Sequence, residues 1–365
     1  MKVSIITLHR ITNFGSLLQT YATQKYIQSL GYDTEVVDFV PDGITFKRAV
    51  WPKGASLVSK AIKFAPLLFC NILQFNIANS FIDKYIKVTE KRYYNYKELS
   101  ENPPEADIYI SGSDQVWNTQ NNNPADDLKA YYLCFAPENK RKIAYAGSFG
   151  KEDFSEAEQK EINSWLKRYA SISVREDVAI NTLDSMGIKG EWVTDPTLLL
   201  SQEEWRAFCK KDKPKPGYVF VYNLNRNKIL EEAAVKIAAE KGLRVVNFAD
   251  TFEFIKGAEN RFNNDAFDFL NYISNADFVV TDSFHGTAFS LNFNRQFVCV
   301  SAPKYNCRLE SILRLTDLLE QRLVFDVEGA VSASKNEIDY SVVEPKLESA
   351  RVKSREFLKT ALEGK

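Results

Sequence analysis

The sequence predicts an α/β protein with two parallel-sheet domains, a helical insertion in the first domain and a C-terminal helix. Short apolar runs alternate with segments of helical periodicity along most of the chain, as in repeated βαβ units. Polar, glycine-containing turns follow several of these apolar runs. Residues 193–200, followed by the lysine- and proline-rich stretch 210–217, interrupt the alternation past the middle of the 365 residues, where an interdomain crossing is expected.

Composition indicates a globular protein and argues against a general nucleic-acid binder. The chain has 47 Lys and Arg residues against 48 Asp and Glu residues, interspersed, so it lacks the basic surface that phosphate backbones require. Five cysteines without CxxC spacing predict neither a disulfide framework nor a metal site. The apolar segment 1–8 is too short for a signal peptide, and no apolar run is long enough to span a bilayer. We therefore expect a cytoplasmic protein.

The first domain is predicted over 1–192. Its strands are expected at 3–8, 34–39, 107–111, 143–150 with the turn included, and 171–174, and its helices at 15–30 and 156–169. A helical insertion is expected at about 50–100. Within it, 57–86 has a very apolar centre preceded by Lys60 and Lys63. Two interpretations stay open for that stretch: a helical hairpin packed on the core, or a peripheral contact with the inner face of a membrane.

The second domain is predicted over 193–340. Its strands are expected at 218–222, 243–248, 278–281 and 297–300, and its helices at 228–241, 266–274 and 287–294. The tail, 341–365, is predicted to be a charged helix over 342–362 that docks through its apolar residues. These are Leu347, Val352, Phe357 and Leu358.

Candidate sites lie in the polar turns that follow predicted strands, because ligands of open parallel sheets bind beyond the carboxyl ends of the strands. The turn 281–287 leads from a strand into a helix and contains His285, one of only two histidines. Imidazole serves as acid or base near neutral pH. The alternative is a plain helix start, capped by Ser283 or Asp282. The first βαβ unit lacks a GxGxxG motif, so dinucleotide binding is not supported.

Six of these segments together resemble the polysaccharide pyruvyl transferase family. They are 13–19 (NFGSLLQ), 112–118 (GSDQVWN), 145–150 (YAGSFG), 173–176 (SVRE), 194–197 (TDPT) and 281–287 (TDSFHGT), and they cover the chain to about Arg322. The second and the last are specific. The resemblance implies the GT-B-like fold, with two Rossmann-like domains facing across a cleft. It also implies transfer of pyruvate from phosphoenolpyruvate to a sugar of a surface-polysaccharide precursor as a cyclic ketal, with release of phosphate and without a cofactor or metal.

This chemistry requires a proton donor for C3 of phosphoenolpyruvate, and His285 is the candidate. A nearby phosphate and carboxylate favour the charged imidazolium, whereas the start of a helix disfavours it, and this balance stays open. The donor carries about three negative charges and needs cations or N–H groups. The candidates are Arg175, Lys304 and Arg308 as cations and Ser283, Gly286 and Thr287 at the helix start. Each arginine has an ordinary alternative, an ion pair with a neighbour such as Glu176.

The acceptor sugar requires a carboxylate that orients or deprotonates a hydroxyl, and Asp114 is the candidate. Its alternative role is to cap the backbone of its own turn. Further acceptor-binding candidates are Asn13, Gly15, Ser113, Gln115, Trp117 and Ser148. Trp117 either stacks on the sugar or belongs to the core. Asp282 is expected to hold the ring of His285 or to cap the helix, and His9 is structural or lies on the acceptor side.

Two other functions stay open. The same fold would suit a glycosyltransferase with a nucleotide-sugar donor, or a catalytically silent sugar-binding protein. Whether the acceptor sugar is free or lipid-linked is not decided by the sequence.

Overall fold

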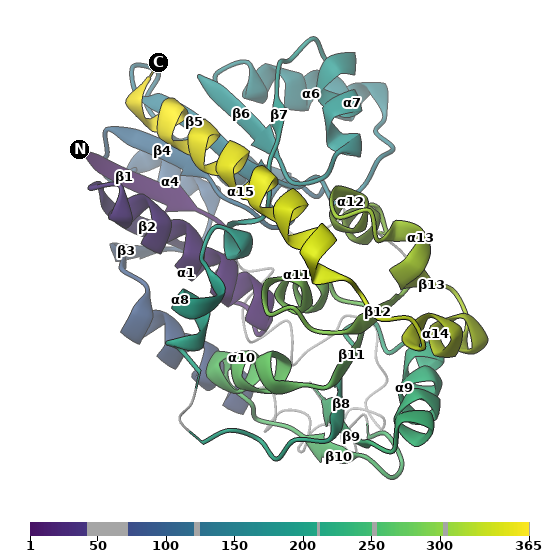
Figure 1. Cartoon of the computed structure of the whole chain (residues 1–365). Coiled ribbons are helices and arrows are strands. Elements are labelled where there is room, and N and C mark those ends of the chain that lie inside the picture. The colour runs from purple at the N-terminus through teal and green to yellow at the C-terminus, as the bar shows by residue number, and fades with distance from the viewer. Residues whose placement is uncertain (42–71, 120–124, 210–211, 250–253, 302–305, 365) are drawn as a thin grey trace, which may run out of the picture. The chain divides into compact units, whose positions relative to one another are not determined.

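The chain forms two compact units. The computed structural model describes residues 1–41, 72–119, 125–209, 212–249, 254–301 and 306–364. Met1–Leu199 and Val352–Lys365 form the first unit, and Leu200–Arg351 form the second. The division therefore follows Leu199, and helix α15 (Tyr340–Glu363) contributes its first part to the second unit and its last part to the first. Figure 1 shows the labelled elements along the chain.

The described part of the first unit contains a seven-stranded sheet in the order β3-β2-β1-β4-β5-β6-β7, with every pairing parallel. Its strands are β1 (Lys2–Ile6), β2 (Asp33–Phe39), β3 (Val88–Tyr93), β4 (Ile108–Ser111), β5 (Arg141–Gly147), β6 (Ser171–Val174) and β7 (Glu191–Trp192). The parallel sheet is confirmed. The expected helical insertion is only partly correct, because β3 lies inside its predicted range and forms one edge of the sheet.

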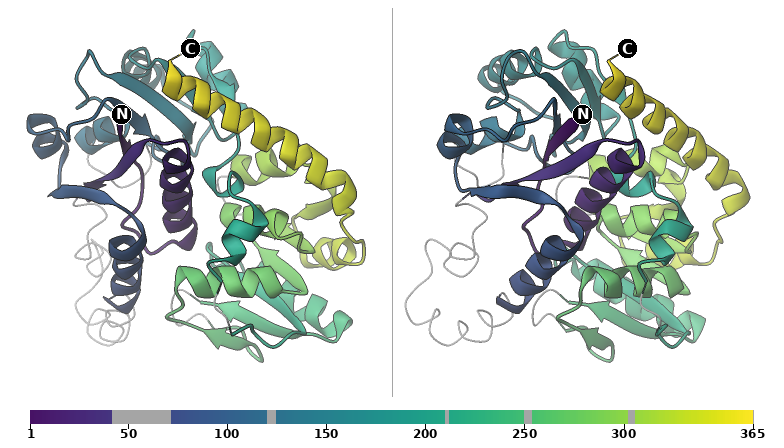
Figure 2. Two further views of the ribbon diagram at one scale, coloured as in Figure 1. Left: turned by 60° about the vertical axis from the view of Figure 1, so that its left-hand side comes forward. Right: turned by 90° about the vertical axis from the view of Figure 1, so that its left-hand side faces the viewer.

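The helices of the first unit begin and end where the local sequence permits. Asn13 caps α1 (Phe14–Ser29) by accepting hydrogen bonds from the backbone N–H groups of Gly15 (2.8 Å) and Ser16 (3.3 Å). Residues 72–85 are helical and lie beside α1 (Figure 2), where Phe81 makes an edge contact with Tyr21. Residues 57–71, with Lys60 and Lys63, lie outside the described residues. The remaining helical elements are α4 (Tyr96–Glu101), α5 (Ala125–Tyr131), α6 (Glu156–Leu166), α7 (Val178–Ser185) and the short η1 (Pro196–Leu198).

The described part of the second unit contains a six-stranded parallel sheet in the order β10-β9-β8-β11-β12-β13. Its strands are β8 (Tyr218–Tyr222), β9 (Arg244–Phe248), β10 (Glu259–Arg261), β11 (Phe278–Thr281), β12 (Phe297–Val300) and β13 (Leu323–Val324). Its other helices are α8 (Gln202–Arg206), α9 (Lys228–Lys241), α10 (Ala266–Asn275), α11 (Phe284–Asn292), α12 (Cys307–Leu315), α13 (Leu319–Arg322) and α14 (Val327–Ser334). The four predicted strands are confirmed, and the two short edge strands were not predicted.

The terminal helix α15 docks by most of the apolar residues expected for it. Leu347, Phe357 and Leu358 are buried, whereas Val352 is exposed and was wrongly expected to pack. Within the first unit, the ring of Phe357 lies 6.4 Å from the ring of Tyr145 on β5, and Ser354 Oγ accepts a hydrogen bond from Thr194 N (2.9 Å).

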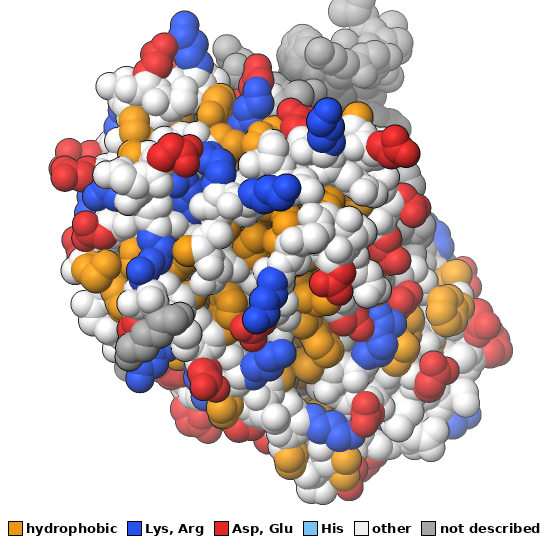
Figure 3. Space-filling model, turned by 90° about the horizontal axis from the view of Figure 1, so that it is seen from above, with side chains coloured by type: hydrophobic (Ala, Val, Ile, Leu, Met, Phe, Trp, Pro, Cys, Tyr) orange, Lys and Arg blue, Asp and Glu red, His pale blue; other side chains and the backbone are white. Residues whose placement is uncertain are grey.

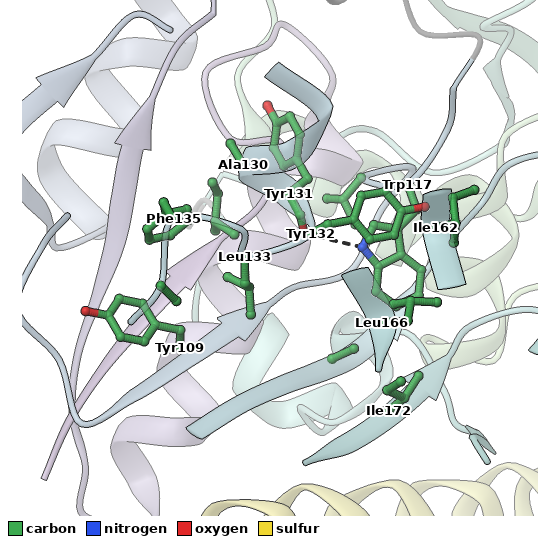
Figure 4. Packing of buried hydrophobic residues seen from close by; sticks show 14 of the residues in the cluster. Tyr109, Trp117, Ala130, Tyr131, Tyr132, Leu133, Phe135, Ile162, Leu166 and Ile172 are labelled. Atoms are coloured by element: carbon green, nitrogen blue, oxygen red, sulfur yellow. Dashed lines mark hydrogen bonds between the residues drawn. The ribbon is translucent and has the colours of Figure 1, made fainter. Parts of the chain in front are cut away.

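Trp117 is part of the hydrophobic core of the first unit (Figure 4). Its indole ring is fully buried, is stacked on Tyr132 with ring centroids 5.4 Å apart, and donates from Nε1 to the carbonyl oxygen of Tyr131 (3.3 Å). Phe149 and Tyr169 contact it from other sides. The core interpretation of Trp117 is therefore correct, because its stacking face is occupied by protein.

Basic and acidic side chains are interspersed on the face shown in Figure 3. This agrees with the near-equal numbers of the two charge types in the sequence. Among the helices of the described residues, none has the length and apolar character needed to cross a membrane.

Candidate functional site

The carboxyl ends of β1, β4, β5 and β6 bring four predicted motifs to one edge of the first sheet. β1 and β4 pair with Ile6 opposite Ser111, and β4 pairs with β5 through Ser111 and Ala144. The chain therefore leaves these strands side by side, and the turns that follow lie together at the carboxyl ends of the strands. We call this group of turns the first edge, which is distinct from the edge strands of the sheet. This arrangement follows from parallel topology, which places all carboxyl ends together.

Asp114 is held in an unusual backbone conformation at the first edge. Its φ is 76°, a left-handed value that a few polar residues tolerate. Its Oδ1 accepts a hydrogen bond from the backbone N–H of Gln115 (2.8 Å), and its Oδ2 accepts one from the hydroxyl of Ser16 on α1. Residue 114 also forms a parallel bridge with Gly147. The capping role considered from the sequence is thus present, and the carboxylate is also oriented by a second element.

Asp195 links the loop of Asp114 to Arg175. Its Oδ2 accepts hydrogen bonds from Ser113 Oγ (2.9 Å) and from Arg175 Nη1 (3.0 Å). Its Oδ1 accepts from both the N–H and the hydroxyl of Thr197 (2.9 and 2.8 Å). A single buried carboxylate therefore joins three strand-end segments. Asp195 belongs to the motif 194–197, but the sequence alone does not indicate its role.

Arg175 is a buried cation between carboxylates. Its Nε donates to Glu176 Oε1 (3.0 Å), as the alternative interpretation of this arginine expected. Burial would lower the pKa of the guanidinium, but Glu176, Asp195 and Asp114 raise it above the ordinary arginine value. Arg175 is thus placed with the predicted acceptor loop in the first unit, and its charge lies within electrostatic range of Asp114.

A bulge at the end of β5 shapes the same edge. Ala146 has a φ of 52°, and its N–H donates to the hydroxyl of Ser173 (3.1 Å), which in turn donates to Ala144 O (3.0 Å). The register with β6 shifts between Ala144 and Gly147. Bulges of this kind re-aim the residues that follow them. Ser148 comes directly after this bulge and is fully buried, and its carbonyl oxygen accepts from Trp117 N (3.1 Å).

The remaining acceptor candidates have local partners. Asn13 and Gly15 form the capped start of α1, and Gln115 Oε1 accepts from Asn118 Nδ2 (2.6 Å). Gly150, with φ of 66°, packs so closely against this amide pair that a Cβ there would lie 2.6 Å from Asn118 Nδ2. These residues shape the first edge.

His9 belongs to a second polar cluster of the first unit. Its Nδ1 lies 3.1 Å from Thr7 O and its Nε2 lies 3.2 Å from Asp38 Oδ1. Arg10 donates to both oxygens of Asp38 (2.5 and 2.9 Å), and Arg92 Nε also donates to Asp38 (2.9 Å). Burial would raise the pKa of Asp38, but His9, Arg10 and Arg92 lower it well below the usual range. The ring of His9 is fully buried, so its structural interpretation fits the geometry.

In the second unit, the turn after β11 and the first turn of α11 form what we call the second edge. Ser283 caps α11 by accepting a hydrogen bond from Gly286 N (3.3 Å), and its carbonyl oxygen accepts from Thr287 Oγ1 (3.1 Å). A Cβ on Gly286 would lie 2.4 Å from Thr281 Oγ1, so only glycine fits. The three residues predicted as donor-binding thus build the helix start. His285 is the second residue of α11 and is 4% exposed.

Asp282 does not cap α11, and its described hydrogen bonds do not go to His285. Its Oδ1 accepts from Leu224 N (2.8 Å), and its Oδ2 accepts from Asn225 N (3.1 Å) and Asn225 Nδ2 (3.0 Å). The expected roles are therefore wrong: this carboxylate holds the loop that follows β8. Burial raises the pKa of Asp282, and the N–H groups of that loop offset part of this rise.

The two remaining cation candidates follow β12. Arg308 is the second residue of α12 and is half-buried, whereas Lys304 lies outside the described residues. In the same unit, a cavity of about 510 Å³ is lined by residues of α13, β13, α14 and the turn between β13 and α14, among them Leu323, Phe325 and Gly329. Its lining includes none of the predicted site residues. Among the described residues, no group of three or more His, Cys, Asp or Glu side chains is placed to hold a metal ion.

A comparison with models of known protein families shows to which family the chain belongs. Residues 13–302 match the model of the family described as polysaccharide pyruvyl transferase. The chain belongs to the polysaccharide pyruvyl transferase family. The family makes it a transferase, and the match spans both edges described above. A comparison with curated protein sequences finds no significant match.

Solved structures that resemble this pyruvyl transferase family member share its fold. A putative UDP-N-acetylglucosamine 2-epimerase from Listeria monocytogenes has a TM-score of 0.57 at 9% identity, covering 98% of this chain and 90% of the epimerase chain. The Rickettsia bellii UDP-N-acetylglucosamine 2-epimerase has a TM-score of 0.55 at 12% identity, with 100% and 96% covered. Arabidopsis thaliana UGT89C1 complexed with quercetin has a TM-score of 0.52 at 12% identity, with 100% and 99% covered. The predicted GT-B fold class of two Rossmann-like domains is confirmed.

The two motifs that are specific for the pyruvyl transferase family fall on the two edges. Residues 112–118 carry Asp114 on the first edge, and 281–287 carry His285 on the second. The loop 223–227, whose Leu224 and Asn225 donate hydrogen bonds to Asp282, was missed, although this Asn-rich run follows a predicted strand directly. Asp38 was also missed, although it lies at the end of a predicted strand.

Proposed function

We propose that this transferase moves pyruvate from phosphoenolpyruvate to a sugar of a surface-polysaccharide precursor as a cyclic ketal and releases phosphate. The observation that carries the proposal is the placement of the family's two specific motifs. Each lies at the carboxyl end of a parallel sheet, and each holds one side chain suited to acid or base chemistry, Asp114 and His285.

His285 is the proposed proton donor. A proton added from His285 to C3 of phosphoenolpyruvate leaves positive charge at C2, and a sugar hydroxyl then forms a C–O bond there. The proton of this hydroxyl is released to solvent, and the imidazole of His285 takes up one proton from solvent in return. The second hydroxyl attacks C2 next, the C–O bond to phosphate breaks, and the second hydroxyl's proton leaves with the phosphate. The net reaction consumes one phosphoenolpyruvate and one diol and yields one ketal and one phosphate. Ser283, Gly286, Thr287, Lys304 and Arg308 are the proposed donor-binding residues.

Asp114 is proposed to orient the attacking hydroxyl. Its carboxylate is stabilised by Ser16, by the N–H of Gln115 and by the nearby charge of Arg175. Because both of its oxygens are held by these hydrogen bonds, the carboxylate is oriented to accept a further hydrogen bond from a sugar hydroxyl. This fixed orientation supports a role in positioning the sugar. Asn13, Gly15, Ser113, Gln115 and Ser148 are proposed to shape this side. We propose that Arg175 acts here through Asp114 rather than on the donor.

Donor consumption tests the proposal. The protein is incubated with phosphoenolpyruvate and a panel of galactose, mannose and N-acetylhexosamine acceptors, free and lipid-linked, and inorganic phosphate is measured. Release of phosphate that depends on one acceptor supports pyruvyl transfer. Release of nucleoside diphosphate from a nucleotide sugar, without phosphate release from phosphoenolpyruvate, would replace it with glycosyl transfer. No turnover with any donor would favour a silent sugar-binding protein.

A further inference from the structure

Tyr131 is fixed to the segment that carries Asp114. It is the last residue of α5, and its carbonyl oxygen accepts hydrogen bonds from Ser111 Oγ (2.7 Å) and from Trp117 Nε1 (3.3 Å). Ser111 and Trp117 stand three positions before and three positions after Asp114 in the sequence. The backbone of Tyr131 is therefore anchored at both ends of the turn that holds Asp114 at the first edge.

The ring of Tyr131 lies at the carboxyl ends of the strands. It makes an edge contact with Phe39, the last residue of β2, with ring centroids 5.5 Å apart. Burial, together with the charges of Asp127 and Asp114, raises the pKa of Tyr131. The phenol is therefore a neutral hydrogen-bond donor at any working pH, and it lies within electrostatic range of Asp114.

The hydroxyl of Tyr131 has no hydrogen-bond partner among the described residues, although the side chain is only 1% exposed. Nearly all buried polar groups are hydrogen-bonded, because a buried group without a partner costs free energy. An ordered water or a ligand is the usual partner where the protein supplies none. The position of this hydroxyl therefore points to a group that binds at the first edge.

Two further buried oxygens at the first edge share this property. Ser148 Oγ and Gln19 Oε1 are fully buried and lack a hydrogen-bond partner within the described part of the chain. Ser148 follows Gly147, whose backbone bridges to Asp114. Gln19 stands one turn after Ser16 on α1, and the hydroxyl of Ser16 donates to Asp114. The segments that carry these oxygens thus meet the turn of Asp114 from different sides.

We propose that the hydroxyl of Tyr131 donates a hydrogen bond to the acceptor sugar at the first edge, beside the bond that Asp114 accepts from it. The inference rests on the proposed function for the assignment of the first edge to the acceptor. A sugar hydroxyl both donates and accepts hydrogen bonds, so a neutral phenol and a carboxylate are complementary partners for a neutral sugar. Ser148 Oγ and Gln19 Oε1 supply further partners for its hydroxyls.

Tyr132 provides a matched control for Tyr131. Its hydroxyl is also buried and without a hydrogen-bond partner among the residues that the structure describes. Its ring, however, is stacked on Trp117 in the core, and the ring of Tyr131 points away from this pair (Figure 4). The charges that raise the pKa of Tyr132 include those of Glu158 and Glu161. The two neighbouring tyrosines therefore differ in location but not in the state of their hydroxyls.

Tyr131→Phe and Tyr132→Phe test the contact. Each change removes one buried hydroxyl without a partner and keeps the ring, so neither should lower the urea midpoint of unfolding. We expect the KM for the acceptor that supports phosphate release to rise about three- to tenfold in Tyr131→Phe, with the KM for phosphoenolpyruvate unchanged. In Tyr132→Phe both KM values should stay within about twofold. An acceptor KM that is unchanged in Tyr131→Phe, or that rises equally in both variants, would overturn the assignment.

Deoxy analogues of that acceptor give a result that a purely structural role would not produce. In the unmutated protein, the analogue that lacks the hydroxyl bound by Tyr131 should bind more weakly than the parent sugar. In Tyr131→Phe, this analogue and the parent sugar should bind within about twofold of each other, because the contact is already lost. Equal losses for every analogue in both proteins would contradict a direct contact.

Calorimetric titration with the free galactose, mannose and N-acetylhexosamine sugars separates this inference from the proposed function, because it requires no turnover. Sugar binding that weakens in Tyr131→Phe but not in Tyr132→Phe, without phosphate release from phosphoenolpyruvate, would sustain the contact and reject the donor. Turnover of phosphoenolpyruvate with sugar affinity unchanged in Tyr131→Phe would reject the contact and leave the proposed function standing. No binding of any of these sugars to the unmutated protein, together with no turnover, would overturn both.

Discussion

The two edges are built with different chemistry. At the first edge, buried charges of opposite sign meet: Arg175 lies between Glu176 and Asp195, and Asp114 is close enough to contribute. At the second edge, the buried carboxylate of Asp282 is satisfied by neutral N–H groups of the loop after β8. The arginine candidate described in this unit, Arg308, is half-buried at the start of α12.

This difference indicates what each edge can bind. Where buried charges neutralise one another, they fix loops rigidly but leave little net charge for a ligand, which suits a neutral sugar. Where the structural carboxylate is held by amides, no buried cation is needed to balance its charge. We therefore expect the same fold element, a turn beyond a parallel strand, to serve the sugar in one unit and the anionic donor in the other.

The largest expected effect is that of His285→Ala on turnover. Loss of a general acid typically costs about 10²- to 10⁴-fold in rate, so phosphate release should fall by about a thousandfold, with acceptor binding retained. Lys335→Met, an exposed change in the same unit, is the control. Turnover reduced by less than about tenfold in His285→Ala would remove this residue from the chemistry.

Arg175→Met should produce the largest loss of stability. It leaves the carboxylates of Glu176 and Asp195 buried without their cation, which costs about 3–5 kcal/mol. The free energy of unfolding is measured by urea titration. Lys97→Met, which removes an exposed pair with Glu101, should change it by about 0.5 kcal/mol or less. A loss below about 1 kcal/mol in Arg175→Met would show that the ion network does not fix the first edge.

Gly147→Ala tests how closely the core approaches the first edge. A Cβ at this position would lie 2.7 Å from the indole ring of Trp117, so we expect a loss of about 1–3 kcal/mol in the free energy of unfolding. The same change in a Trp117→Phe background should cost less, because the smaller ring relieves the clash. Equal losses in both backgrounds would mean that Trp117 is not the obstacle.

The smallest expected effect is on the pH dependence of stability, to which the carboxylates of Asp38 and Asp282 contribute with opposite sign. The lowered pKa of Asp38 means that its stabilising contribution is complete above about pH 4, the ordinary carboxyl value, and is lost as pH falls toward the lowered pKa. The raised pKa of Asp282 means that its charge costs stability at neutral pH, and that this cost is relieved as pH falls through the raised pKa toward about 4. The free energy of unfolding of Asp38→Asn, Asp282→Asn and the unmutated protein, measured as a function of pH, gives the contribution of each carboxylate. If the two contributions changed in the same direction as pH falls, the predicted difference between the two carboxylates would be contradicted.

The fold and the turn of His285 were predictable because they depend on local sequence. Apolar runs such as 278–281 and the capped start of α11 are determined by neighbouring residues. The short strands β7, β10 and β13 lack a periodic pattern, and β3 is an edge strand with mostly polar side chains. They escaped prediction because pairing with a neighbour, rather than their own composition, makes them strands.

The partners of the site residues were not predictable, because they depend on which strands become neighbours. β4 lies beside β1 although residues 30–107 separate α1 from β4, and this places Ser16 against Asp114. Likewise, the pairing of β8 with β11 gives Asp282 to the loop 223–227 instead of to His285. The sequence indicates where polar turns occur, and the strand order decides what they hold.

We propose that the first edge binds the sugar and the second unit binds the phosphorylated donor. Measuring the KM of each substrate in two variants, Asp114→Asn and Arg308→Met, tests this division most directly. We expect Asp114→Asn to lower kcat and raise the KM for the acceptor while the KM for phosphoenolpyruvate stays unchanged. We expect Arg308→Met to raise the KM for phosphoenolpyruvate while the KM for the acceptor stays unchanged. A raised KM for phosphoenolpyruvate in Asp114→Asn, together with a raised acceptor KM in Arg308→Met, would contradict it.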